Sequence, residues 1–186
     1  MKQIVCLMVF GMCGTVMAVD TSRQTVDGGA VPEMRQISAD SERAASRKKM
    51  CDRMQADLEL YGKDGLRAIE QAYRAYSQSK DVDNEQLQTL ITKYPKANRT
   101  GCAVMYAGQR ARGSDDGKWF RLAIEKYGDC LYGNGVQVGA YARFYLARYL
   151  YRAGRKAEAD ALRDEILKLY PDARTHRGQK LADYLQ

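Results

Sequence analysis

Lys93-Tyr94-Pro95-Lys96-Ala97 is the first of three related phrases in this chain of 186 residues. The other two are Lys126-Tyr127-Gly128-Asp129-Cys130 and Leu169-Tyr170-Pro171-Asp172-Ala173, and each of the three ends a stretch with the apolar spacing of an amphipathic helix. The tyrosines lie 33 and then 43 residues apart. A period in the low thirties, built from helix pairs, is typical of stacked helical hairpins. The phrase therefore predicts an all-α fold of stacked antiparallel hairpins.

The segments between the phrases supply the expected helices. No run alternates with the period of two that is typical of a strand. Met50, Met54 and Leu58 recur at four-residue steps and predict an N-terminal helix over about 41–60, which Tyr61-Gly62 ends. Further helices are expected at about 64–79, 83–94, 98–112, 115–127, 140–153, 156–170 and 174–185, the last of which would cap the array.

Residues 1–18 have the pattern of an export signal. Lys2 is the only charge before Asp20, an apolar stretch follows it, and Val16-Met17-Ala18 places small residues where a signal peptidase reads. We expect cleavage near Ala18 and an exported protein, periplasmic or extracellular. The apolar stretch is short for a membrane span, so an uncleaved anchor is the second interpretation and a lipid-anchored form the third.

The rest of the chain reads as a linker and one domain. Residues 19–38 are polar, contain Gly28-Gly29 and show no sustained apolar period, which predicts a flexible linker before a helical domain over 39–186. The net charge is +7, but Arg47-Lys48-Lys49 is the only tight basic cluster, and acidic residues follow it. Such a cluster is typical of a solvated helix face. We therefore expect no nucleic-acid partner, and at most a peripheral association with membranes.

The segment from Ala140 to Pro171 resembles a tetratricopeptide repeat, and is similar to the repeats of bacterial envelope proteins that end in Tyr-Pro. The residues that carry this resemblance are Leu146, Ala147, Leu150, Gly154, Ala159 and Pro171. Arg143 and Arg163 depart from it, because bulky apolar or aromatic residues are common at their positions. The resemblance implies a short solenoid with units at about 63–96, 97–130 and 140–173, of which only the third matches the pattern well.

In this family the first helix of each hairpin lines a concave groove that binds a segment of a partner protein. The resemblance therefore implies a partner-binding set on the helix at 140–153, namely Tyr141, Phe144, Arg148, Tyr151 and Arg152. Tyrosine and arginine are residue types that anchor interfaces. The alternative is that several of these aromatic side chains fill the core between the second and third units. We expect a protein or peptide partner in the cell envelope, while the oligomeric state stays open.

Cys102 and Cys130 fall at neighbouring ends of the second expected hairpin. The first stands at the start of one helix and the second just past the end of its antiparallel partner, so a disulfide between them is geometrically accessible in an exported protein. The alternative is that these thiols and Cys51 are reduced and buried. A metal site is not expected, because the cysteines lack ligand spacing and His176 is the only histidine.

No catalytic constellation stands out, so we expect neither an enzyme nor a cofactor. The glycine-rich segment 128–139 lacks the lysine and the preceding strand of a phosphate loop. Two alternatives remain open. One is a small-ligand site or an active site that uses this segment with His176 and nearby arginines. The other is a structural envelope component that self-associates through the helix at 41–60.

Overall fold

The structure, a computed structural model, describes the backbone of residues 32–111 and 117–184 and the side chains from residue 44 onward. Within these residues the fold is all-α and contains no strand, as the sequence predicts. The expected signal and most of the expected linker lie outside them. The elements are α1 (Pro32–Gln78), α2 (Glu85–Lys93), α3 (Asn98–Ala111), α4 (Lys118–Lys126), α5 (Val138–Arg152), α6 (Lys156–Leu169) and a 3₁₀ helix, η1 (Leu181–Tyr184).

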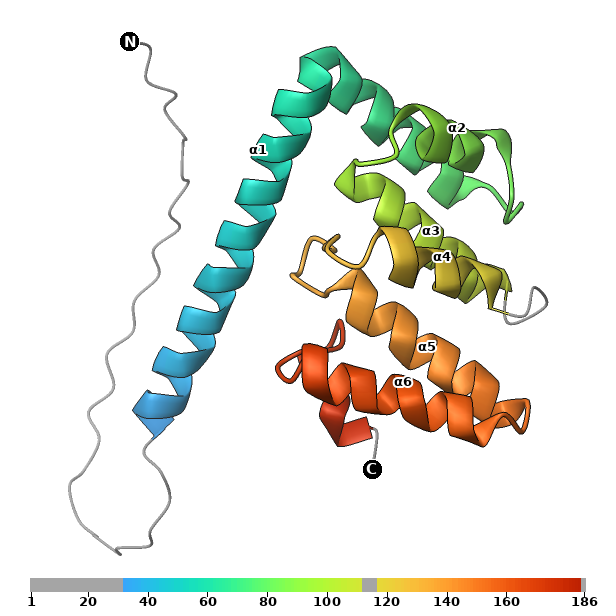
Figure 1. Ribbon diagram of the computed structural model, residues 1–186. Coiled ribbons are helices and arrows are strands. Elements are labelled where there is room, and N and C mark those ends of the chain that lie inside the picture. Colours follow the sequence, from blue (N-terminus) through green and yellow to red (C-terminus); the bar gives the residue numbers. More distant parts are fainter. Residues whose placement is uncertain (1–31, 112–116, 185–186) are drawn as a thin grey trace, which may run out of the picture.

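The first helix is two helices joined at Gly62. Gly62 has φ 67° and ψ 178°, a conformation that essentially only glycine adopts. The part before it, residues 32–61, is called the N-terminal rod below, and Figure 1 shows it standing along one side of the other helices. Because the rod begins at Pro32, residues 32–38 are helical and do not belong to a flexible linker.

The remaining helices stack in the order of the sequence (Figure 1). Each helix packs against the next one along the chain, and in addition α1 packs on α3 and α3 packs on α5. The core between them is apolar and includes Leu90, Met105, Leu146 and Ile166, all 1% exposed or less. Burial of each such side chain contributes about 1.5–3 kcal/mol. The odd-numbered helices thus form a continuous row in which α3 lies between α1 and α5.

The repeated phrase is the same turn made three times. Tyr94, Tyr127 and Tyr170 are the C-caps of α2, α4 and α6, and the N–H of each donates to the carbonyl four residues earlier. The residue three positions later then donates its N–H back to the tyrosine carbonyl, at 3.0–3.1 Å in all three cases. The prediction that each phrase ends a helix is confirmed.

The second and third copies of the phrase are each followed by a small β-bridged loop. Leu131 bridges Gln137, and 43 residues later Arg174 bridges Lys180. Gly135 and Gly178 occupy the same place in the two loops, and both have φ 80°. The interval from Tyr127 to Tyr170 is longer than the first interval because it contains the first of these loops. A second copy of the loop follows the third phrase.

The prediction of a capping helix over 174–185 is wrong, because the second loop occupies the first part of this segment. Bridge hydrogen bonds take up the backbone of the loop, and the left-handed Gly178 is incompatible with a continuing α-helix. Of the described residues from 174 to 184, only the four residues of η1 are helical, and Leu181 at its start is buried. η1 begins directly after the second loop, just as α5 begins directly after the first loop.

Candidate functional site

The five residues of the predicted partner-binding set all lie on α5, but the structure separates them. Tyr141 and Phe144 are each only 7% exposed. Arg148, Tyr151 and Arg152 are exposed, and Tyr151 reaches 60%. The set therefore does not form one open surface.

The segment after the third phrase covers the buried pair. The His176 ring lies 4.9 Å from the Tyr141 ring, and the Tyr184 ring lies 6.2 Å from that of Phe144. Tyr132 completes this aromatic cluster, with its ring 4.9 Å from His176. The sequence interpretation missed these contacts because it placed His176 and Tyr184 on a regular helix.

The exposed arginines line a depression of about 490 Å³ between α3, α4 and α5. We call it the α5 depression, and its lining residues are Gly108, Gln109, Phe120, Tyr145, Arg148, Tyr149, Arg152 and Ala153. Tyr151 is not part of it, and its ring instead lies beneath the ammonium of Lys156 at 5.7 Å. The structure thus brings Arg148 and Arg152 together with two tyrosines that the predicted set does not contain.

Close packing of α3 against α4 shapes the aromatic lining. A Cβ atom on Gly108 would lie 2.6 Å from the Phe120 ring, so only glycine lets this ring approach α3. The Phe120 ring in turn stacks on Tyr145, with ring centroids 5.7 Å apart and planes at 21°. The step from 145 to 149 along α5 keeps both tyrosines on the side of the arginines at 148 and 152. That helical spacing was the available sequence signal for Tyr145 and Tyr149.

Charge is distributed unevenly between the helices. Over their full lengths α3 and α5 carry five arginines and no aspartate or glutamate. α6, in contrast, carries both signs: Glu158, Asp160, Asp164 and Glu165 stand beside Lys156, Arg163 and Lys168. Local concentrations of one sign of charge attract the opposite sign from solution.

Arginine–tyrosine contacts recur along the row of odd-numbered helices. Arg99 of α3 lies over the Tyr73 ring at 4.8 Å and pairs with Glu70 at 2.9 Å. Arg110 lies over both Tyr76 and Tyr106. Burial raises the pKa of Tyr76 from 10 to about 12, so its phenol stays protonated even in moderately alkaline solution.

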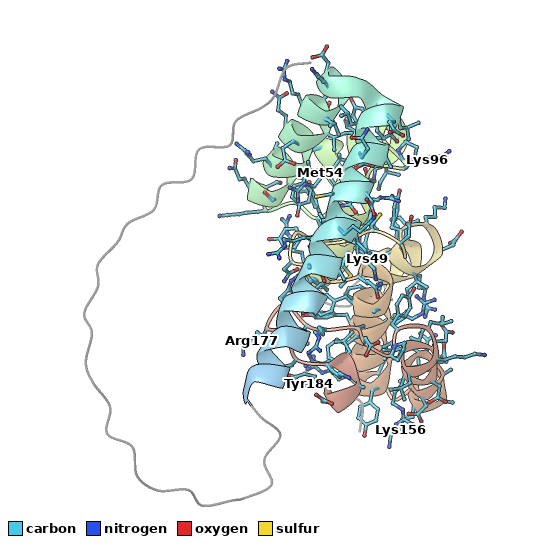
Figure 2. All side chains as sticks on the ribbon, turned by 90° about the vertical axis from the view of Figure 1, so that its left-hand side faces the viewer. Lys49, Met54, Lys96, Lys156, Arg177 and Tyr184 are labelled. Carbon is cyan, nitrogen blue, oxygen red and sulfur yellow. The ribbon has the colours of Figure 1, made fainter. Side chains whose placement is uncertain are left out.

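The N-terminal rod docks where α3 begins, through a group of polar contacts that we call the rod junction. Asp57 accepts a hydrogen bond from the N–H of Asn98 at 2.9 Å, which caps α3 from another helix. Arg53 pairs with Asp129 at 2.6 Å and donates to the Lys96 carbonyl at 2.9 Å. Figure 2 looks onto the rod, with Lys49 and Met54 labelled on it. Burial raises the pKa of the Asp57 carboxyl above its ordinary value of 3.8, and its hydrogen bond with Asn98 opposes that shift.

The cysteines of the described part are free thiols, and the predicted Cys102–Cys130 disulfide is not observed. Cys102 donates to the Leu131 carbonyl at 3.4 Å, while the Cys130 sulfur fills the space beside Gly101. Burial raises the pKa of both thiols to about 12. Cys51, in contrast, is exposed on the rod.

The glycine-rich segment 128–139 folds back on the start of α5. Val138 donates its N–H to the Cys130 carbonyl at 2.9 Å, and Gly139 donates to the Gly128 carbonyl at 3.2 Å. These two donors are therefore not available to a ligand. His176 lies 2.9 Å from the Asn134 amide, and burial lowers its pKa. Within the described residues no group of histidine, cysteine or acidic side chains is arranged to hold a metal ion.

Comparisons with known proteins do not assign the chain to a group: no family model matches it, and neither does any curated protein or solved structure. None of the helices in the described part is both long enough and apolar enough to cross a membrane.

Proposed function

We propose that the chain is a protein-interaction module with a short solenoid of tetratricopeptide type, which binds an extended segment of a partner protein along its odd-numbered helices. The packing order supports the solenoid, because hairpin arrays of this type stack first helices on first helices. Here α1 packs on α3 and α3 on α5, while the even-numbered helices connect them.

The α5 depression is the observation that carries the binding proposal. It combines the tyrosine and arginine side chains of α5 with Phe120 of α4, and tyrosine and arginine are among the residue types that dominate the energetics of interfaces. Among the described residues, neither Arg148 nor Arg152 has an ion-pair partner, whereas Arg143 of the same helix pairs with Glu165 of α6. Arginine side chains that are exposed and unpaired beside aromatic rings are more typical of a binding surface than of a surface that only stabilises the fold.

The proposal places the module in the cell envelope, because residues 1–18 carry the pattern of an export signal. The mature protein would then begin at Val19. N-terminal sequencing of the protein from the envelope fraction of its own host tests this part directly. A chain that stays with the cytoplasmic fraction would refute export, and a chain in the envelope that keeps Met1 would favour an uncleaved anchor.

Site-specific photo-crosslinking tests the binding proposal. A photoreactive phenylalanine analogue would replace Gln109 or Tyr149 in the depression and, as controls, Leu167 or Leu169, which are exposed on α6. We expect the same discrete adduct from both depression positions and none from the controls. Adducts from the α6 positions alone would show that the partner binds at α6 and not at the depression. No adducts at any position would refute the proposal that the chain is a protein-interaction module.

The alternative of self-association is tested in the same experiment. Met54 is 63% exposed on the rod, and a photoreactive side chain there would yield a dimer of the chain if rods associate. We expect no such dimer. Its formation in place of a heterologous adduct would favour a structural component.

A further inference from the structure

We propose that the α5 depression is selective for acidic segments, in which alternate aspartate or glutamate side chains pair with Arg148 and Arg152. This inference rests on the proposed function and specifies its ligand. It follows from three features of the depression: its charge, its spacing and its aromatic wall.

The charge of the depression is positive and uncompensated within the described residues. Its lining contains two arginines and no acidic side chain, and neither α3 nor α5 contains an acidic residue. Arg143, the other arginine of α5, is already paired with Glu165 at 2.7 Å. Arg148 and Arg152 are therefore the cations of this helix that remain for a partner.

The spacing of the two arginines suits an extended chain. They lie four residues apart on one helix, which separates them by about 6 Å along its axis. Alternate side chains on one face of an extended peptide repeat at about 6.7 Å. An acid-x-acid sequence would thus place one carboxylate opposite each guanidinium.

The aromatic wall holds one arginine in place and adds contact area. The Arg148 guanidinium lies 5.5 Å from the centroid of the Phe144 ring, an arrangement that orients it without using its N–H donors. Tyr145, Tyr149 and Phe120 line the depression itself, and can pack against the methylene groups of the two acidic side chains and against the peptide backbone between them. Charge-assisted hydrogen bonds beside apolar surface are stronger than those in open water.

The surroundings favour a peptide over a polyanion. A nucleic acid or an anionic membrane presents charge over a wide area, whereas α6, next to α5, carries four acidic and three basic side chains and so does not extend the positive surface. A volume of about 490 Å³ suits a few side chains of a single peptide segment. Because the positive charge is confined to Arg148 and Arg152, we expect selectivity for a short acidic sequence and not for an extended polyanion.

Selection from a random library of twelve-residue peptides tests the proposal and requires no candidate partner. The purified protein is the bait, and the R148E/R152E double variant is panned in parallel. We expect enrichment of acid-x-acid sequences with the wild-type protein only. Fluorescence anisotropy with the best peptide should show binding on the order of a hundredfold weaker for R148E/R152E, about tenfold for each arginine.

Two further variants guard against misfolding and nonspecific charge effects. R148Q/R152Q removes the charge without reversing it, and should bind at an intermediate affinity. K93E/K168E reverses two exposed lysines in the last turns of α2 and α6, as Arg152 stands in the last turn of α5, and should bind like the wild-type protein. Thermal unfolding of each variant shows that it is folded.

Several results would overturn the inference. One is enrichment of peptides without acidic residues, another is equal binding by R148E/R152E, and a third is tighter binding of a single-stranded oligonucleotide or of phosphatidylglycerol vesicles than of the best peptide. Photo-crosslinks at the depression combined with non-acidic peptides would refute only the acidic selectivity. No enrichment together with no crosslinks would refute the proposed function as well.

Discussion

Asn98 shows how single polar side chains fix the edges of this fold. It is 6% exposed, and its amide pairs with both backbone groups of Leu131, at 2.8 Å in each case, as a neighbouring β-strand would. Its own N–H is held by Asp57 of the rod. One residue thus joins the start of α3 to the β-bridged loop and to the rod junction.

Removal of this amide should be costly. In Asn98→Ala the buried N–H of Leu131 loses its partner and the Leu131 carbonyl keeps only the weak bond from the Cys102 thiol, so we expect the free energy of unfolding to fall by about 2–4 kcal/mol. Urea denaturation followed by circular dichroism measures it. Asn134→Ala, an exposed asparagine of the same loop, should change it by less than about 1 kcal/mol. Equal effects of the two substitutions would contradict this role for Asn98.

The cysteines should differ sharply in reactivity. A thiol reacts as its thiolate, so the pKa of about 12 at Cys102 and Cys130 makes both slow, and their burial slows them further. With iodoacetamide at pH 8 and peptide mapping, we expect labelling at Cys51 and at neither buried thiol until urea is added. Rapid native labelling of Cys130 would show that the rod junction opens readily.

The same mapping tests the predicted disulfide. If Cys102 and Cys130 are paired in protein from the envelope, both stay unlabelled in urea until a reductant is added. If they are free, as in the structure, both label in urea alone.

At the scale of elements, the sequence was informative wherever local chemistry ends a helix. The Tyr94, Tyr127 and Tyr170 phrases were sufficient to place the ends of α2, α4 and α6, because each makes a short-range turn. The loop after Ala173 was not predictable in the same way. Its bridge depends on Arg174 and Lys180, whose pairing has no distinctive composition, so the spacing of the segment predicts a helix instead.

Gly62 is the element-scale feature with the clearest test. At φ 67° and ψ 178° an alanine would be strained by about 1–3 kcal/mol, although no atom would clash with its Cβ. We expect Gly62→Ala to lower the free energy of unfolding by that amount in urea denaturation. Gly133→Ala is the matched control, because its Cβ also meets nothing and its backbone is not left-handed; it should be within about 0.5 kcal/mol of wild type. If Gly62→Ala does not lower the free energy of unfolding, the two parts of α1 are joined in another backbone geometry at residue 62.

Across the whole molecule, the candidate site was harder to predict than the fold. Arg148 and Arg152 were anticipated from a family resemblance, and the structure places them in one depression. Tyr141 and Phe144 were placed with them, but are covered by the segment that carries His176 and Tyr184. Burial of that kind depends on contacts between distant parts of the chain, so it cannot be predicted from the spacing of residues along one helix.

The rod is the other feature that only the assembled molecule explains. Its sequence predicts an amphipathic helix, yet Met54 and Leu60 are 63% and 53% exposed, and polar groups at Arg53 and Asp57 make the junction with the stack. Apart from Tyr61, which packs against the Tyr94 ring at its end, the rod is held largely by the rod junction, and it should open more easily than the core of the stack.

Hydrogen exchange of an Arg53→Ala variant tests this difference in stability. The substitution removes the pair with Asp129 and the bond to the Lys96 carbonyl, so the rod should open more often. We expect exchange of the amides over 44–58 to be about tenfold faster, equivalent to roughly 1.4 kcal/mol, with no change in α5 or α6. Lys48→Ala is the control, since its pair with Asp52 is exposed and lies within the rod, where it contributes little. Faster exchange throughout the molecule would show instead that the rod and the stack unfold as one unit, and then partner binding at α5 would be coupled to the rod.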